Sequence, residues 1–476
     1  MNSLKLLQKI WLGSLLLIFS SCATYYQKNY DLMQAIYNGN LDNAEQLLTD
    51  KKWQKPNRNI LLYYFNKGTV LSLNGKFSES NQYFQQADYY IEDFHKNYAR
   101  SFVGLLTNPG YTTYAGESFE QILLHYYTTI NYLQMGNYES ALVECKRMQL
   151  KMQKITDLYG GKNKYSKDAF CLNLMGMVYE GLKDYNNAFI SYKNAYEIYK
   201  ADYVGLATKT PLQLKKDILR TAYLTGFNDQ VEYYQKEFEM NLEIPNKDRG
   251  SLVFFWNNGL GPVKDQNSIT FTIMPMGGGM VNFVNPELAM QFQFYVGEDD
   301  KKSLTALRIV RVAFPKYVSR VPYYANASIL DTTGIIGQFE KAEDINAIAY
   351  KSLDDRMAKE IGEALLRVAL KQAAEQLARK ENQGAGMILG IVNALTEQAD
   401  TRNWQLLPNT INYTRIELPE GENKLDLSLK TYKALENKIP FCFNIKKGNV
   451  LYHSLNTLEF NGYSDRSGNL INFSQW

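Results

Sequence analysis

Cysteine is scarce in this chain: four occur among 476 residues, and none of them forms a CxxC pair or a Cys/His cluster. Cys22 belongs to an N-terminal segment treated below, which leaves Cys145, Cys171 and Cys442. An odd set of three excludes a complete disulfide framework. We expect free, buried thiols, although Cys145 and Cys171 lie on segments that could stack as neighbours and be bridged.

The chain also lacks an excess of charge of one sign. It has 52 Lys and Arg against 49 Asp and Glu, a net charge of +3. Without Lys5 and Lys9 of the N-terminal segment, the count is 50 against 49, or +1. Nucleic-acid-binding domains carry a strongly basic face. We therefore expect no nucleic-acid partner.

Motifs of catalysis are missing as well. The three histidines, His95, His125 and His453, are far apart, and no nucleophile motif, metal-ligand spacing or cofactor loop is present. The triple glycine at 277–279 is not followed by Lys-Ser or Lys-Thr, so it predicts a flexible connection rather than a phosphate-binding loop. We expect a protein that is not an enzyme and that holds no cofactor and no metal.

The composition that remains is that of a folded protein. Apolar residues make up 45% of the chain and charged residues 21%, and the length suits two or three domains. Tyrosine is abundant, with 36 residues against 23 phenylalanines. Because tyrosine packs as an aromatic ring and hydrogen-bonds at its tip, it suits wet interfaces and the grooves of helical repeats alike, and repeat packing is favoured.

The N-terminus has the pattern of a signal peptide. Lys5 and Lys9 precede a ten-residue apolar core at 10–19, which is too short to span a bilayer, and Ser20 and Ser21 lead to Cys22. The sequence FSSC at 19–22 resembles the lipobox of bacterial lipoproteins, with Phe19 in place of the usual Leu. The alternative is an ordinary cleaved signal followed by a chance cysteine.

The lipobox resemblance implies acylation of Cys22 and removal of residues 1–21, which leaves 22–28 as a lipidated linker. Two or three acyl chains hold a protein stably on a membrane. Neither an Asp nor an acidic run follows the cysteine, and the resemblance then implies an outer-membrane anchor on the periplasmic face.

The stretch 168–199 has the spacing of a helical hairpin. Small residues recur where two antiparallel helices approach closely, and aromatics recur where the groove between them is filled. These positions are Gly176, Tyr179, Tyr185, Ala188, Tyr192 and Ala195. The stretch resembles a tetratricopeptide repeat, which implies a stacked scaffold that binds other molecules.

Four further segments fit the same pattern with decreasing quality: 29–50, 59–93, 120–154 and 212–238. Together they predict a repeat domain over 29–243. Gly39 and Gly75 are 36 residues apart, close to the repeat length, but Gly136 follows 61 residues later. The interruption at 106–118 is rich in Gly, Pro, Thr and Tyr and predicts a projecting loop.

Residues 114–148 resemble a segment of a family of uncharacterised bacterial lipoproteins that combine such repeats with a C-terminal β-rich domain. The candidate binding residues in this segment are Tyr114, Glu120, Glu144 and Arg147. Glu144 and Arg147 are three apart on one helical face, and Glu120 could reach Arg147 across the hairpin. A structural ion pair is the favoured interpretation, and His125, a lone helical histidine, is also favoured as structural.

Beyond residue 249 the helical period gives way to period-two runs, which predicts an α+β domain over 249–476. The expected strands are 251–256, 269–273, 307–314, 411–418, 424–429, 441–445 and 450–455. The last four are expected to complete an antiparallel set. A helix at 354–381 should cover the sheet, and the apolar run 384–395 predicts a buried helix, with membrane or partner contact as the alternative.

The stretch 400–422 again resembles the lipoprotein family. Arg402 and Trp404 are the candidates for a second binding surface, because these residue types carry much interface energy. Packing in the core, with a surface pair between Asp400 and Arg402, is an equal alternative.

These observations predict an α + β multidomain chain: an N-terminal α-helical tetratricopeptide-like solenoid, followed by an α+β domain with a mostly antiparallel sheet. The family it resembles has no assigned activity, so the resemblance informs architecture more than function. The favoured function is a lipid-anchored scaffold on the periplasmic face of the outer membrane, which binds envelope proteins through its repeat groove. The alternative is a lipid-anchored glycan-capture protein of the starch-utilisation type.

Overall fold

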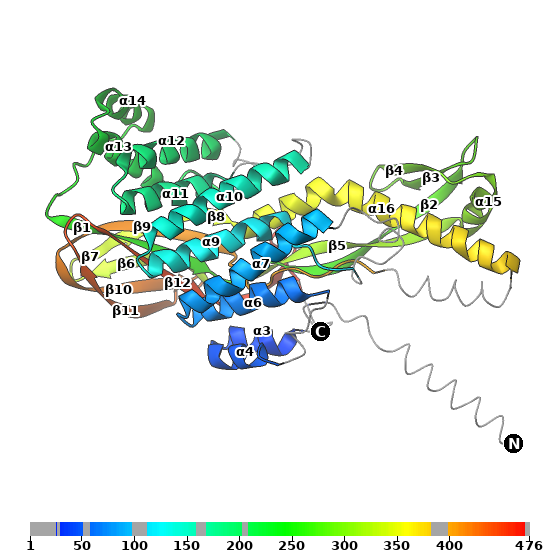
Figure 1. Cartoon of the computed structure of the whole chain (residues 1–476), viewed down its shortest axis with the longest axis horizontal. Coiled ribbons are helices and arrows are strands. Elements are labelled where there is room, and N and C mark those ends of the chain that lie inside the picture. Colours follow the sequence, from blue (N-terminus) through cyan, green and yellow to red (C-terminus); the bar gives the residue numbers. More distant parts are fainter. Residues whose placement is uncertain are drawn as a thin grey trace, which may run out of the picture.

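The computed structural model describes residues 25, 29–50, 58–97, 112–158, 168–201, 208–381 and 398–471, and it shows a helical part stacked on a β-rich part (Figure 1). The expected fold class is confirmed: helical hairpins come first and mostly antiparallel sheets follow. Cys22 and the run 384–395 lie outside the described residues, as do 106–111 of the expected loop. The described helices include none that combines the length and the apolar character needed to span a bilayer.

Each segment that fits the repeat pattern forms a pair of antiparallel helices. The pairs are α3 (Tyr30–Tyr37) with α4 (Leu41–Leu47), α6 (Ile60–Leu73) with α7 (Phe77–Asn97), α9 (Ser118–Gln134) with α10 (Tyr138–Leu158), α11 (Ala169–Gly181) with α12 (Tyr185–Ala201), and α13 (Leu212–Thr225) with α14 (Asn228–Phe238). Residues 112–117 of the expected loop contain no helix or strand.

The turns of these hairpins share one backbone conformation. Gly39, Gly75, Gly136 and Gly226 have φ between 67° and 79°. Lys183 takes the same place between α11 and α12 at φ 61°, although a side chain is disfavoured there. The turn geometry is therefore kept even where the glycine is not.

Close helix contact explains the small residues of the pattern. A Cβ added to Gly176 on α11 would lie 2.5 Å from the ring of Tyr192 on α12, and a Cβ on Gly68 would lie 2.9 Å from the ring of Phe84. Ala188 and Ala195 are fully buried in the same contact region, while Tyr179 and Tyr185 are partly exposed. In these two hairpins an aromatic ring of the second helix thus packs directly on the backbone of the first.

The first helices α6, α9 and α11 are buried on almost every side, whereas the second helices α7, α10 and α12 keep exposed faces. The inner face of the solenoid is covered by a sheet of the β-rich part (Figure 1). That sheet has the order β12 (Val450–Thr457), β1 (Arg249–Asn258), β9 (Thr410–Pro419), β8 (Glu340–Asp344).

A second sheet packs on the other face of the first. Its order is β11 (Glu436–Ile445), β10 (Gly421–Thr431), β6 (Tyr324–Asp331), β7 (Gly334–Gln338). The apolar core between the two sheets includes Leu252, Phe254, Ile416, Leu427 and Ile445. Alternate residues of β1 therefore face different partners: Leu252 and Phe254 face the second sheet, and Val253 and Phe255 belong to the core shared with the solenoid.

A third sheet extends away from the solenoid as an arm, at the right of Figure 1. Its order is β14 (Leu470–Ile471), β13 (Phe460–Ser464), β5 (Ile309–Pro322), β2 (Val263–Pro275), β3 (Met280–Asn285), β4 (Met290–Tyr295). Helices α15 (Glu298–Leu307) and α16 (Ile345–Glu381) cover its outer half through a core of their own, which includes Ile361 and Leu365. The expected helix at 354–381 thus begins nine residues earlier and covers a sheet.

Several expectations need correction. The expected strands do not form one antiparallel set, because β12 pairs with β1 in parallel register. A hairpin fixes opposite directions only for neighbours in sequence, and β12 and β1 are distant. The strand expected from residue 307 begins at Ile309, since Leu307 still belongs to α15. Cys145 and Cys171 are buried free thiols, but Cys442 is exposed, because it lies on the edge strand β11 and points away from the core.

The two parts of the chain share one hydrophobic core. A continuous cluster runs from Leu32 and Ile36 of α3, through the solenoid, to Tyr413 and Tyr452 of the first sheet. Tyr25 lies in the stretch expected to be a linker, yet its ring is buried and its backbone N–H donates to Thr401 Oγ1 at 3.1 Å. The boundary near residue 245 therefore separates a helical part from a β-rich part, but the two parts do not have independent cores.

Candidate functional site

The candidate binding residues fall into two places in the structure. Tyr114, Glu120, Arg402 and Trp404 meet at the junction of the solenoid and the β-rich part, although Trp404 is 284 positions from Glu120. Glu144 and Arg147 lie instead beside a pocket on the outer side of the solenoid. The sequence pattern gave no sign of this separation.

At the junction, Glu120 holds three donors from different parts of the chain. It stands in the first turn of α9, where its Oε2 accepts the backbone N–H of Glu117 at 2.9 Å and the hydroxyl of Tyr114 at 2.6 Å. Its Oε1 accepts the backbone N–H of Trp404 at 2.6 Å. Burial, together with the nearby charge of Glu117, raises the pKa of Glu120 to about 7. A single carboxylate therefore caps a helix and joins the two parts.

Trp404 lies inside the solenoid core. Its ring stacks on Phe65 with centroids 4.4 Å apart, and its Nε1–H donates to Thr69 Oγ1 at 3.1 Å. Tyr127 packs against it at 5.4 Å. Only 1% of the side chain is exposed. Trp404 thus packs against the chain's own repeats, as the core-packing alternative expected.

Arg402 joins three segments. It pairs with Asp400 at 2.7 Å, donates to the carbonyl of Thr112 at 2.9 Å, and lies over the ring of Tyr114 at 5.2 Å. The expected pair between Asp400 and Arg402 exists, but Arg402 is itself buried. Arg402 and Trp404 do not form the second binding surface considered from sequence, because the solenoid covers both.

A second buried cluster lies next to this junction. Glu117 contacts Lys264 Nζ of β2 through its Oε1 and Arg356 Nη2 of α16 through its Oε2, the latter at 2.6 Å. Burial by itself raises the pKa of Glu117, but the charges of Arg356 and Lys264 outweigh it and hold the pKa below its usual value. Glu117 therefore ties the loop before α9 to the arm.

The same region contains a cavity of about 450 Å³. It lies between the loop 112–117, strand β5 and helix α16, and it borders on Asp400. Burial raises the pKa of Glu360 on its wall. The described residues that line this cavity include acids and bases but no His, Cys or Ser. The cavity has charged groups for holding a polar molecule.

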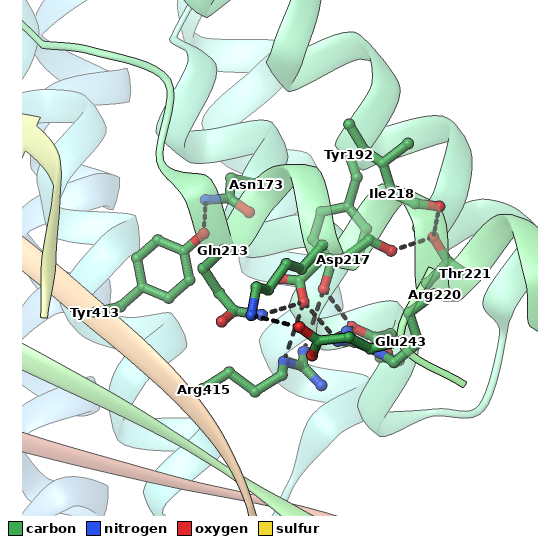
Figure 2. A network of polar contacts seen from close by, with 12 residues as sticks. Asn173, Tyr192, Gln213, Asp217, Ile218, Arg220, Thr221, Glu243, Tyr413 and Arg415 are labelled. Atoms are coloured by element: carbon green, nitrogen blue, oxygen red, sulfur yellow. Dashed lines mark hydrogen bonds and ion pairs between the residues drawn. The ribbon is translucent and has the colours of Figure 1, made fainter. Parts of the chain in front are cut away.

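A network of buried charges joins the solenoid to strand β9 (Figure 2). Glu180 Oε2, at the end of α11, accepts from Arg415 of β9 at 2.6 Å and from Arg220 of α13 at 2.7 Å. Asp217 receives Arg220 at 2.7 Å, and the Tyr192 hydroxyl donates to Glu180 at 2.6 Å. Burial opposes ionisation of Glu180, but the two arginines hold its pKa below the usual value. This network connects the solenoid to the β-rich part through buried ion pairs.

The pocket on the outer side lies between α7 and α10, with α9 beneath it. His125 Nδ1 is 2.7 Å from Glu144 Oε2, and its Nε2 is 3.6 Å from Asp88 Oδ1. Arg147 reaches Glu144 Oε1 at 3.2 Å. The expected pair of Glu144 with Arg147 is present, while Glu120 is engaged at the junction. Glu144 and Arg147 are accessible from this pocket, so their role in binding stays a prediction.

Sequence reasoning missed the network of Figure 2, although a signal existed. Glu180 is the only acid in the apolar helix α11, and a buried acid requires a cation. The lack of a polar side on α6 and α11 is a second signal. Such helices must be covered all round, and another part of the protein has to provide the cover.

Comparisons with known proteins give a limited result. No protein-family model matches the chain, and no curated protein matches it in sequence. Three solved structures each cover 45% of this chain: one titled "MamA MSR-1 C2" (12% identity, TM-score 0.27, 93% of that chain), a set of nearly identical TPR-like repeats of kinesin light chain type from Podosopora anserina (12%, 0.28, 96%), and the Rap conjugation gene regulator of plasmid pLS20 in complex with the Phr* peptide (14%, 0.26, 52%).

Proposed function

We propose that this chain is a non-enzymatic scaffold lipoprotein of the cell envelope, which binds protein partners on the outer side of its solenoid. The proposal rests on the difference between the inner and the outer side of the solenoid. The inner helices are covered by the chain's own β-rich part, and the outer helices keep large apolar side chains exposed. The partner-binding groove expected from sequence is thus occupied by the chain itself, and the outer side takes its place.

The exposed apolar residues lie on three successive outer helices. Tyr89 of α7, Val143 and Leu150 of α10, and Ile190 of α12 have between 45% and 60% of their surface exposed. A group of exposed apolar residues on the helices of a rigid scaffold is typical of protein interaction sites. A protein partner therefore fits this surface better than a small polar ligand.

The proposed anchor is the acylated Cys22, on the periplasmic face of the outer membrane. Tyr25, three residues later, is fixed against Thr401 and the solenoid core. Three residues span at most about 11 Å. An acyl chain on Cys22 would therefore hold the folded part close to the membrane surface.

The proposal contains no catalytic step. The buried acids Glu117, Glu120 and Glu180 each hold together segments that are distant in sequence. Their chemistry is accounted for by the fold.

Crosslinking followed by purification from envelopes tests the partner surface. The variant Val143→Glu/Leu150→Glu places two charges on the outer side, and we expect it to lose the partners that the natural chain captures. The matched control is Tyr432→Glu/Leu435→Glu, on the exposed turn between β10 and β11, which should keep them. Equal capture by both variants, or no reproducible partner for the natural chain, contradicts the proposal.

The anchor is tested separately. Radiolabelled fatty acid should enter the natural chain and not Cys22→Ser, and the variant should leave the membrane fraction. Label in Cys22→Ser would show that the lipobox interpretation is wrong. Digestion of the protein by protease added to intact cells would contradict the periplasmic placement and favour the glycan-capture alternative.

A further inference from the structure

Three methionines lie on a single turn of the arm, between β2 and β3. The turn has the sequence MPMGGGM at 274–280. Met274 and Met276 are 45% and 38% exposed, and Met280 is half-buried. Single exposed apolar side chains are normal on a protein surface, but a group of them marks a place where something binds. Three side chains of one kind on one turn therefore call for a ligand that suits that kind.

The register of the sheet places the three side chains on one face. Met276 and Met280 are opposite each other, since the N–H of Met276 donates to the carbonyl of Met280 at 2.9 Å. Pro275 and Val281 form the next pair, and Val281 is buried in the core that α16 covers. Because successive side chains of a strand point to opposite faces, Met276, Met280 and Met274 all lie on the outer face.

The spacing on that face brings the three sulfurs within reach of one point. Opposite residues of an antiparallel pair have Cβ atoms about 4.5–5.5 Å apart, and diagonal neighbours are about 7–8 Å apart. Met276 and Met280 are opposite, and Met274 and Met280 are diagonal. The sulfur stands beyond Cβ on an unbranched, adaptable side chain. The three thioethers can therefore meet above the sheet without movement of the backbone.

The backbone of the turn is held in place. Gly278 and Gly279 have φ 65° and 73°, a conformation that favours glycine. The N–H of Gly279 donates to Glu298 Oε1 at 2.7 Å, and Glu298 Oε2 pairs with Lys301 at 3.0 Å. The carboxylate of Glu298 is thus engaged in fixing the turn. A turn fixed in advance loses less conformational freedom when its side chains gather round a ligand.

The chemistry of the donors selects the ligand. The sequence lacks the metal-ligand spacings of histidine, cysteine and acidic residues, but the thioether of methionine is a separate class of ligand. Thioethers are soft and uncharged, and they favour Cu(I) over ions such as Mg²⁺ and Ca²⁺, which take oxygen ligands. Tyr295 of β4 is opposite Met280 and 74% exposed. Its ring offers a cation a further attractive surface.

We propose that Met274, Met276 and Met280 bind one soft monovalent metal ion, Cu(I) or its analogue Ag(I), through their three sulfurs. A thioether has no proton to lose when it binds a metal, whereas histidine and cysteine do. The affinity of this site should therefore change little between about pH 8 and pH 5. The inference is independent of the proposed scaffold function.

NMR of the methionine methyl groups tests the site directly. The full chain is labelled with ¹³C in these methyl groups and carries Cys22→Ser and Cys442→Ser, which remove thiols that compete for Ag(I). On addition of Ag(I), the signals of Met274, Met276 and Met280 should shift together and saturate at one ion per chain. The signal of Met135, a methionine on α9 that is 42% exposed, should stay in place. Shifts no larger than that of Met135, or three signals that saturate independently, overturn the proposal.

Variants of the same chain assign the affinity to the sulfurs. Met276→Leu and Met280→Leu each keep an apolar side chain of similar size and remove one sulfur, so each should weaken Ag(I) binding at least tenfold. Met135→Leu, the same change at a comparably exposed position, should leave the binding unchanged. Unchanged Ag(I) binding in both turn variants overturns the proposal. A tenfold or larger fall in affinity from pH 8 to pH 5 also overturns it, because it would show a donor that takes up a proton.

Discussion

The backbone N–H of Trp404 donates to Glu120 Oε1 at 2.6 Å, and this bond connects the first turn of α9 to the β-rich part. The carboxyl of Glu120 has a pKa of about 7 in the folded chain, raised from 4.5 by burial and by Glu117. The folded state therefore binds a proton more tightly than the unfolded state does. The stability from this effect is complete below pH 4.5 and is lost as the pH rises to about 7.

The first prediction concerns this pH dependence. Glu120→Gln removes the titrating group, so the part of the stability loss between pH 4.5 and pH 7 that Glu120 causes, on the order of 3 kcal/mol, should disappear. Urea unfolding at a series of pH values measures it. The control Glu139→Gln, exposed on α10, should keep the natural slope. An unchanged slope in Glu120→Gln would show that the carboxyl does not retain its proton in the fold.

The second prediction concerns the network of Figure 2. Arg415→Met removes a buried cation from Glu180 and Asp217 and should cost about 3–5 kcal/mol of unfolding free energy. Arg466→Met breaks the exposed pair with Asp354, where Arg466 is 61% exposed, and should cost less than about 1 kcal/mol. Denaturant unfolding compares them. Similar costs for the two variants would mean that the network does not join the solenoid to β9.

The third prediction compares two helical glycines. Gly176→Ala places a Cβ 2.5 Å from the Tyr192 ring and should destabilise the protein by about 1–3 kcal/mol. Gly362→Ala, in α16, places a Cβ 3.6 Å from Phe292, an ordinary contact, and should stabilise by up to about 1 kcal/mol because alanine favours a helix. Thermal melts give the sign of each change. Two changes of the same sign would contradict the close contact of α11 with α12.

The fourth prediction concerns the turn between α11 and α12. Lys183 has φ 61°, a conformation in which the other hairpin turns have glycine. Lys183→Gly should therefore raise the unfolding free energy by about 0.5–1 kcal/mol, the strain relieved less the entropy that glycine adds to the unfolded chain. Lys193→Gly, at an exposed position inside α12, should lower it by about 1 kcal/mol. A loss of stability in Lys183→Gly would show that the strain is absent.

Local patterns allowed the helical hairpins and most strands to be predicted from sequence. The spacing of Gly176, Ala188 and Tyr192 reflects contacts within a single hairpin, and the alternation in β1 and β9 reflects contacts within a sheet. Both are short-range effects and leave a period in the sequence. The hairpin at 212–238 was the weakest match, but it too is present as α13 and α14.

The docking of the two parts could not be predicted in the same way. Trp404 and Arg402 were candidate binding residues in the sequence, but nothing near them identifies Glu120 or Tyr114 as their partners. The pairing of Arg415 with Glu180 left no sign in the sequence around Arg415. Contacts across 200 to 300 positions leave no period. Three tyrosines of the solenoid make the same kind of long-range contact. The hydroxyls of Tyr127, Tyr138 and Tyr199 donate to backbone carbonyls of the β-rich part.

The all-round burial of α9 has a consequence for the order in which the chain is made. Its inner side is covered by residues that leave the ribosome more than 120 positions later, since Tyr126 bonds to Asn257 and Tyr127 to Leu406. While synthesis proceeds between these points, completed hairpins present an apolar surface to the surrounding water. A chain that stops near residue 245 should therefore aggregate, even though every hairpin of the repeat pattern is complete, because the residues that cover the inner side of α9 have not yet been made.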